Sequence, residues 1–195
     1  MEKEYFYELL RQSVQDADMH PDELPGLDLY MDQIITLMEG KLASNKRYES
    51  DKLLTKTMIN NYSKEGLIKP IKGKKYSKEH ITQMLLIYSL KGTLSIQEIK
   101  SFLYWAEECG EKMTPQAVTD GYEKFLEGKA YQRELLPEQV QCMLEETGCD
   151  VTSKEGVFQA VLALSAMSQY LKVMVEKLLD SEILPAKEEA VLPCE

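Results

Sequence analysis

The chain has few of the cysteine and histidine residues on which secreted scaffolds and many enzymes depend. It contains four cysteines and two histidines in 195 residues, and no two cysteines form a C-x-x-C pair. A chain of this length can bury a core without disulfides, so we expect Cys109, Cys142, Cys149 and Cys194 to be ordinary thiols. No P-loop, G-x-G-x-x-G motif or Ser-His-Asp arrangement can be recognised. We therefore expect neither an enzyme nor a cofactor.

Long apolar runs and metal-binding motifs are also missing. The longest stretch without a charge, 156–171, has 16 residues and contains Gln, Ser and Tyr, so it is too short and too polar to span a bilayer. The N-terminus carries both signs of charge and no signal-peptide core. The acidic motif at 16–22 resembles the start of a calcium loop, but Pro21 and Leu27 replace its glycine and its closing glutamate. We expect a cytoplasmic protein without a bound metal.

Positive charge is scarce except in one segment. The whole chain carries a net charge of −10, yet residues 41–80 hold eleven basic and four acidic residues. This segment has a charge of +7, and the other 155 residues carry −17. Such a partition indicates an acidic body that offers one surface to a polyanion. A solvated lysine-rich stretch without a partner is the alternative on charge alone.

Apolar residues recur at helical spacing almost throughout the chain. The expected helices cover residues 3–17, 28–42, 55–64, 77–90, 95–109, 114–128, 137–146 and 152–180. Cap signals support most of them: Asp28, Ser77, Ser95 with Glu98, Thr114 before Pro115, and Thr152 with Glu155 at N-termini, and Gly66 at a C-terminus. Pro137 is expected to open a new helix rather than to lie within one.

The segment 67–76 differs from the rest because it combines apolar residues with Pro70 and Gly73. This pattern predicts a small β-hairpin. The expected elements follow the order of a winged helix-turn-helix: a helix, a turn, a short helix, a basic hairpin and a helix. The expected fold class is all-α with a small β-hairpin wing. The expected domains are an N-terminal helix and linker (1–26), a winged helix-turn-helix (27–105), a C-terminal helical domain (106–180) and a flexible tail (181–195).

The short helix 55–64 has two chemically different faces. At about 100° per residue, Met58, Ile59 and Tyr62 fall on the core side. The outer side carries Lys56, Thr57, Asn60, Asn61 and Lys64, and no carboxylate. Amides can pair bidentately with adenine, and lysine reaches guanine or phosphate. The lysines at 72, 74 and 75 are suited to gripping phosphates beside a groove.

These residues resemble the recognition helix and wing of MerR-type regulators. The matching positions in the helix and turn are Thr55, Ile59, Tyr62, Glu65, Gly66, Leu67 and Pro70. Tyr76-Ser77-x-Glu79 resembles the end of the wing, and Leu94-Ser95-Ile96-x-Glu98-Ile99 resembles the start of a later helix. The resemblance implies a MerR-like winged helix over 27–105. The DNA-binding residues expected from pattern and resemblance together are Thr55, Lys56, Thr57, Asn60, Asn61, Lys64, Lys72, Lys74, Lys75 and Tyr76.

A closer resemblance, covering most of the chain, is to a bacterial family known as domain of unknown function 1836. The segments that carry it are Asp28-Leu-Tyr-Met-Asp-Gln33, Leu54-Thr-Lys-Thr-Met-Ile-Asn-Asn-Tyr62 and Lys75-Tyr-Ser-Lys-Glu-His80. This resemblance implies no activity. His80 lies in the first turn of its helix and is expected to be a surface or capping residue.

The last helix is apolar over more than half of its circumference. Such a helix is buried in a bundle or in a dimer interface; its pattern favours the bundle core, with self-association as the alternative. A single winged helix has a small footprint on DNA, and two half-sites remedy this. We therefore also expect a homodimer joined through this helix, with Leu164, Leu171 and Val175 at the interface.

The sequence thus predicts a sequence-specific DNA-binding transcription regulator whose partner is double-stranded DNA, and which an unknown effector could control. The alternative function is a protein-interaction module, built on a winged helix that no longer binds DNA and docks an acidic partner.

Overall fold

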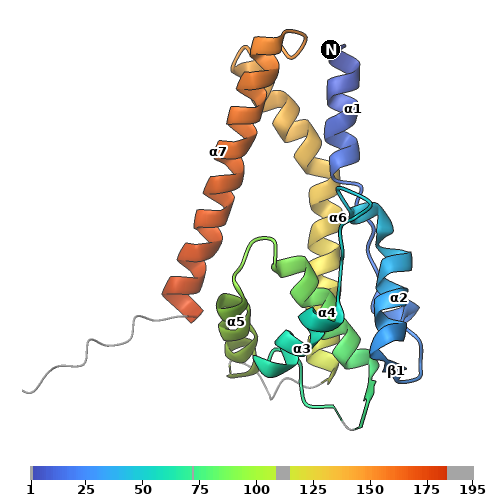
Figure 1. The fold of residues 1–195 in the computed structure, drawn as a ribbon. Helices are drawn as coiled ribbons and strands as arrows, with labels where there is room; N and C mark the ends of the chain where they lie inside the picture. Colours follow the sequence, from blue (N-terminus) through green and yellow to red (C-terminus); the bar gives the residue numbers. More distant parts are fainter. Residues whose placement is uncertain (1, 72, 109–114, 184–195) are drawn as a thin grey trace, which may run out of the picture.

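The computed structural model describes residues 2–71, 73–108 and 115–183, and this part is mostly helical (Figure 1). Its helices are α1 (Lys3–Ser13), α2 (Met31–Lys41), α3 (Lys56–Lys64), α4 (Lys78–Leu90), α5 (Ile96–Glu108), α6 (Pro115–Glu146) and α7 (Lys154–Leu178). The strands are β1 (Leu29–Tyr30) and β2 (Lys75–Tyr76), and a π-helical turn, η3 (Leu179–Ile183), continues α7. The expectation of a helical chain with one small antiparallel sheet is confirmed.

The sheet does not form where the sequence predicted it. A hairpin within 67–76 is wrong: β2 pairs antiparallel with β1, which precedes α2, with Leu29 opposite Tyr76. This pairing buries both side chains, whereas a local hairpin would have to use Pro70, which has no N–H to donate. The loop between α3 and β2 is consequently fixed at both ends, by the end of α3 and by the sheet.

Local capping chemistry sets several helix ends as predicted. Gly66 ends α3 with φ of +76°. At the start of α3 the Met58 N–H donates to Thr55 Oγ1 at 3.2 Å, a cap that the sequence did not predict. Ser77 precedes α4, and its N–H donates to Nδ1 of His80, which confirms His80 as a capping residue. The Ser95–Glu98 capping box is also present.

Two other caps are corrected, one by two residues and one by a single residue. Tyr30, not Asp28, occupies the N-cap position of α2, because Leu29 and Tyr30 are held in the sheet. Ser153, not Thr152, caps α7 by accepting the Gly156 N–H at 2.9 Å. Thr114, Cys109 and Cys194 lie outside the described residues.

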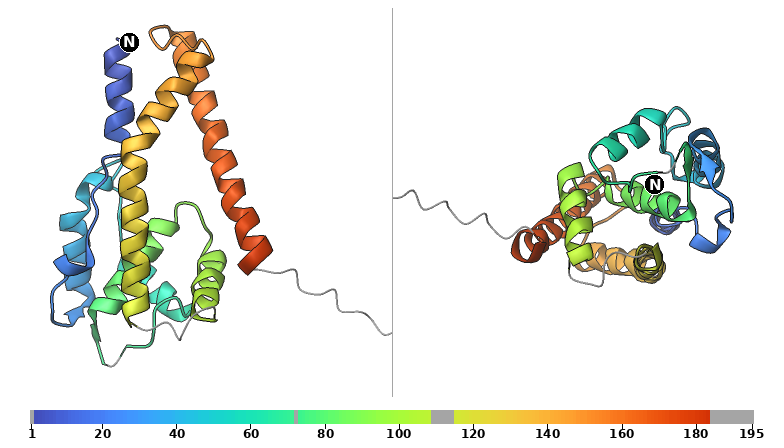
Figure 2. Two further views of the ribbon diagram at one scale, coloured as in Figure 1. Left: turned by 180° about the vertical axis from the view of Figure 1, so that it is seen from behind. Right: turned by 90° about the horizontal axis from the view of Figure 1, so that it is seen from below.

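Helix α6 replaces the two helices expected at 114–128 and 137–146. It runs without interruption through Gly128 and Pro137, and it bends in its C-terminal half (Figure 2). Proline removes one helical hydrogen bond and bends a helix rather than ending it where neighbouring elements hold both halves. Here α4 packs against the N-terminal half and α1 against the C-terminal half.

Two clusters of buried side chains hold the chain together. The first, drawn from residues 19–126 and Leu179, joins α2, α3, α4, α5 and the start of α6. The second, smaller cluster joins α1, the end of α6 and the start of α7 through Phe6, Leu144 and Ala160. The first core crosses the expected domain limit at 105, because Tyr122 and Leu126 on α6 belong to it.

Helix α7 is not the core of a bundle, which corrects the favoured interpretation of its pattern. Within α7 only Gly156 and Ala160 are buried. The helix meets α6 at its N-terminal end and diverges from it toward its C-terminal end (Figure 1). Its large exposed apolar side chains are Phe158, Val161, Leu162, Tyr170, Leu171, Val173, Met174 and Leu178. The segment Lys154–Ile183 is long and apolar enough to cross a membrane, by length and composition alone.

The expected flexible tail is corrected at its start. Ser181–Ile183 belong to η3, whose Leu179 is buried in the first core. The remainder of that tail lies outside the described residues.

Candidate nucleic-acid interface

Helix α3 presents a polar, carboxylate-free face to solvent. Its inner face is anchored by Ile59 and Tyr62, both buried, and burial raises the pKa of the Tyr62 hydroxyl. The side chains on the outer face are all exposed: Lys56, Thr57, Asn60, Asn61 and Lys64. Seen from below, α3 lies at the edge of the molecule, on the side away from α6 (Figure 2). The apolar face that the sequence predicts for α3 is therefore buried, and the polar face is exposed to solvent.

The predicted residue Thr55 has a structural task at the start of this surface. Its hydroxyl oxygen accepts the Met58 N–H, and its side chain is only partly exposed. Because this bond fixes the first turn of α3, Thr55 positions the helix on which the other polar side chains lie.

Lys56 is the one outer-face lysine of α3 with a described ion-pair partner. Its Nζ lies 2.7 Å from Oδ1 of Asp32 on α2, and both side chains are mostly exposed. Asp32 therefore adds one negative charge to the border of the polar face. Sequence reasoning missed this residue, because Asp32 and Lys56 come together only through the packing of α2 on α3.

Two more lysines lie at the start of β2: Lys74 directly precedes the strand, and Lys75 is its first residue. Lys74 and Lys75 are exposed, and Nζ of Lys75 lies 5.1 Å from the centre of the Tyr30 ring on the neighbouring strand. Lys72 lies outside the described residues. The pairing of β2 with β1 thus holds Lys75 next to the strand that leads into α2.

Tyr76 does not belong to this outer surface. Its side chain is only 4% exposed, because it lies opposite Leu29 in the sheet and joins the first core. Its expected role as a DNA contact is therefore replaced by a packing role.

The cations of the 41–80 segment divide into two groups. Lys41, Lys46, Lys56 and Lys69 form ion pairs with Glu23, Glu39, Asp32 and Glu79. The other basic residues that the structure describes there have no ion pair: Arg47, Lys52, Lys64, Lys74, Lys75 and Lys78. Helix α6, on the opposite side of the body, carries seven acidic and three basic residues. The α3 side of the body thus holds unpaired cations, while α6 carries a net charge of −4.

The acidic motif at 16–22 has a structural explanation. Asp16 and Asp18 both pair with Lys129 and Arg133 of α6, and they tie the segment after α1 to that helix. Burial alone would raise the pKa of Asp16, but hydrogen bonds from Lys129 and Arg133 outweigh it and lower that pKa. In the described part of the chain, no three His, Cys, Asp or Glu side chains are grouped as metal ligands would be.

Comparison with known proteins gives a family but no activity. The family model described as domain of unknown function (DUF1836) matches residues 19–125, more than half of the chain. This confirms the closer of the two resemblances seen in the sequence. The matched segment nearly coincides with the residues that build the first core. No curated protein and no solved structure matches the chain.

Proposed function

Because the chain belongs to the DUF1836 family, whose description assigns no activity, we propose its function from the geometry of α3. We propose that this face binds double-stranded DNA in a sequence-specific manner, that α2, α3 and the loop before β2 act as a MerR-like winged helix-turn-helix, and that the protein regulates transcription in the cytoplasm.

The observation that carries this proposal is the composition of the exposed face of α3. Two lysines, two amides and a threonine hydroxyl are exposed there, and the face has no carboxylate. A nine-residue helix is about 13 Å long and its width fits the major groove. Asn60 and Asn61 could pair with base edges, while Lys56 and Lys64 could reach guanine or phosphate.

The position of the free cations supports the same surface. Lys64 on α3, Lys74 before β2 and Lys75 in β2 have no described ion pair, so binding a phosphate would not require breaking one. Phosphate contacts position a protein on the duplex, and base contacts specify the sequence. Helix α6, which carries most of its charge as carboxylates, lies on the other side of the molecule from α3 (Figure 2), which would limit its repulsion of DNA.

We further propose that two copies act together through α7. Its apolar side chains are exposed along most of the helix, and the 16 residues from 156 to 171 carry no charge. A neutral stripe allows two chains of charge −10 to approach, and a second copy would cover the same face on both partners, as two-fold symmetry requires. Two winged helices would then contact two half-sites.

The proposal is tested by selecting DNA with the purified protein. A random duplex pool taken through repeated rounds of capture should converge on one motif, with two-fold symmetry if the dimer is correct. If no sequence is enriched, the proposal of sequence-specific DNA binding is contradicted. It would favour the alternative function, in which the same cations hold an acidic protein partner.

The role of α3 within that site is tested by Asn60→Ala. Loss of a bidentate base contact should relax the preference at one base position and cost about 1–3 kcal/mol on the selected duplex. Gln139→Ala, an exposed amide on α6, is the matched control and should bind as the parent does. Unchanged preference in Asn60→Ala would remove Asn60 from the reading surface.

A further inference from the structure

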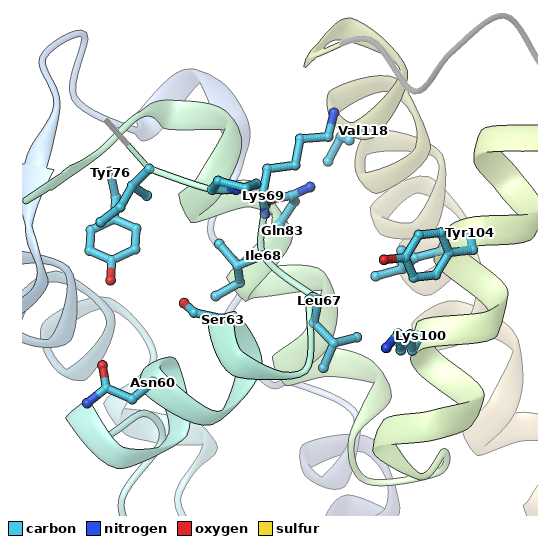
Figure 3. Close-up of a pocket in the computed structure, with 14 residues that line it drawn as sticks. Asn60, Ser63, Leu67, Ile68, Lys69, Tyr76, Gln83, Lys100, Tyr104 and Val118 are labelled. Carbon is cyan, nitrogen blue, oxygen red and sulfur yellow. Dashed lines mark hydrogen bonds between the residues drawn. The ribbon is translucent and has the colours of Figure 1, made fainter. Parts of the chain in front are cut away.

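A cavity of about 630 Å³ lies beside the C-terminal half of α3 (Figure 3). Its walls come from α3, the turn that follows it, β2, α4, α5 and the start of α6. The volume falls within the range of about 300–1,000 Å³ that is typical of small-molecule sites. The walls are largely apolar, with Leu67 and Ile68 on one side and Leu103 on the other.

The polar side chains that enter this cavity are mainly donors. Gln83 on α4 is only 5% exposed, and its side chain faces the Lys69 backbone N–H at 3.4 Å. A backbone N–H can only donate, so the Gln83 atom that faces it is the oxygen. The carboxamide NH₂ group therefore points elsewhere, and Figure 3 shows it directed toward Val118, another residue of the cavity wall.

Helix α5 supplies a cation and a hydroxyl on the opposite side. Lys100 and Tyr104 are four residues apart on one helical face, and Nζ of Lys100 lies 5.8 Å from the centre of the Tyr104 ring. Figure 3 shows the ammonium and the hydroxyl both directed toward the space beside Leu67. The Tyr104 hydroxyl also lies close to Gly66, where an added Cβ would be 3.4 Å from it. The cavity therefore reaches the turn that ends α3.

Lys100 has no ion pair with any carboxylate that the structure describes, unlike Lys69, which pairs with Glu79 at 2.9 Å. Among the residues that the structure describes, no Asp or Glu lines the cavity. The cavity is thus an apolar space that contains an ammonium, a carboxamide NH₂ and a hydroxyl. Such a space favours a hydrogen-bond acceptor that carries negative charge. A ligand that fits must also offer an apolar body to Leu67, Ile68 and Leu103.

We propose that this cavity is a binding site for a small molecule with an apolar body and one carboxylate, which Lys100 holds by charge and the Gln83 amide and Tyr104 hydroxyl hold by hydrogen bonds. Binding at this site does not depend on the proposed function. Its consequence does: Asn60 and Ser63 of α3 line the same cavity, so a ligand there would contact the helix proposed to read DNA. The ligand would then change the affinity for DNA.

The binding site is tested by calorimetric titration of the full chain without DNA. The probes are 4-butylbenzoate and its neutral analogue 4-butylbenzamide, which differ in charge and little in shape. The benzoate should bind at least tenfold more tightly. Equal affinity of the two compounds, or no binding of the benzoate at millimolar concentration, would overturn the proposal.

Two variants locate the bound probe in the cavity. Lys100→Gln should abolish the preference for the carboxylate, while Lys124→Gln, an exposed lysine on α6, should retain it. Leu103→Trp should weaken both compounds alike, because the larger side chain occupies the apolar space. A preference for the benzoate that survives in Lys100→Gln would place the anion elsewhere and contradict the site.

The coupling to DNA is measured separately. Saturating 4-butylbenzoate should change the affinity of the parent for its selected duplex by at least fivefold, and should not change that of Lys100→Gln. A chain that binds the benzoate but no DNA would retain the site and reject the proposed function. A chain that binds DNA but not the benzoate would retain the proposed function and reject the site. Binding of both without an effect on each other would contradict the coupling.

Discussion

Lys56 on α3 and Asp32 on α2 form an exposed ion pair, with 2.7 Å between Nζ and Oδ1, at the edge of the proposed DNA-binding face. Exposed ion pairs contribute about 0–1 kcal/mol to stability, so this pair is not needed to hold α2 against α3. Its main effect is electrostatic, because Asp32 neutralises one of the cations that DNA would meet.

Asp32→Asn should therefore raise the affinity for DNA. We expect an increase of about two- to fivefold at 0.1 M salt, because the Lys56 ammonium becomes available and one repulsive charge is lost. Fluorescence anisotropy with the selected duplex measures it. Glu155→Gln, at the start of α7, changes the net charge equally and should have little effect. Weaker binding by Asp32→Asn would contradict the placement of α3 against DNA.

The loop lysines should act on all DNA sequences alike. Lys74→Ala combined with Lys75→Ala should reduce the slope of log K against log salt by about one for each lost phosphate contact, without changing the preferred sequence. The matched control is the pair Lys154→Ala and Lys177→Ala on α7, both exposed. If the two double variants behave identically, the loop is not a wing.

Helix α7 should carry the dimer contact. The parent should have twice the 22.4 kDa mass of the chain in light scattering at micromolar concentration. Leu171 is 50% exposed, so Leu171→Glu should give a folded single chain rather than an unfolded one. Gln159→Glu, also exposed on α7, should remain dimeric.

Two results would exclude a second copy as the partner of α7. One is a single-chain mass for the parent. The other is co-sedimentation of the parent with phosphatidylcholine vesicles, because the length and hydropathy of Lys154–Ile183 also suit a membrane.

The Asp16 cluster should make stability depend on pH. The pKa of Asp16 in the folded chain lies below its ordinary value of 3.8, so the carboxylate stabilises the fold above that value. This contribution is lost as the pH falls through the lowered pKa. Asp16→Asn should cost about 1–2 kcal/mol at pH 7, after allowance for partial exposure, and less at pH 3, which lies below the ordinary value. Urea unfolding at both pH values measures the difference, with exposed Asp22→Asn as the control.

The features that the sequence predicted correctly depend on near neighbours. The caps by Ser77 and Ser95 and the positive φ of Gly66 each involve residues within a few positions of one another. The two faces of α3 follow from helical geometry alone. Family membership could also be recognised, because it is carried by short contiguous segments.

The errors concern contacts between distant segments. Leu29 pairs with Tyr76, and no local pattern identifies that partner. Pro137 lies inside α6 because packing on both sides overrides its preference for a helix start. The apolar arc of α7 predicts a buried helix whether the cover is its own chain or another. The cavity behind α3 has no sequence signal, since Gln83, Lys100 and Leu67 meet only in the folded chain.

The most direct test of the account is the salt dependence of DNA binding by the parent chain. If four to eight phosphates are neutralised by a dimer, the slope of log K against log salt on the selected duplex should be about −4 to −7. Such a slope, from a chain with a net charge of −10, would require the cations of α3 and its neighbouring loop. A flat salt response, or no affinity for any selected duplex, would contradict the proposal that this surface binds DNA.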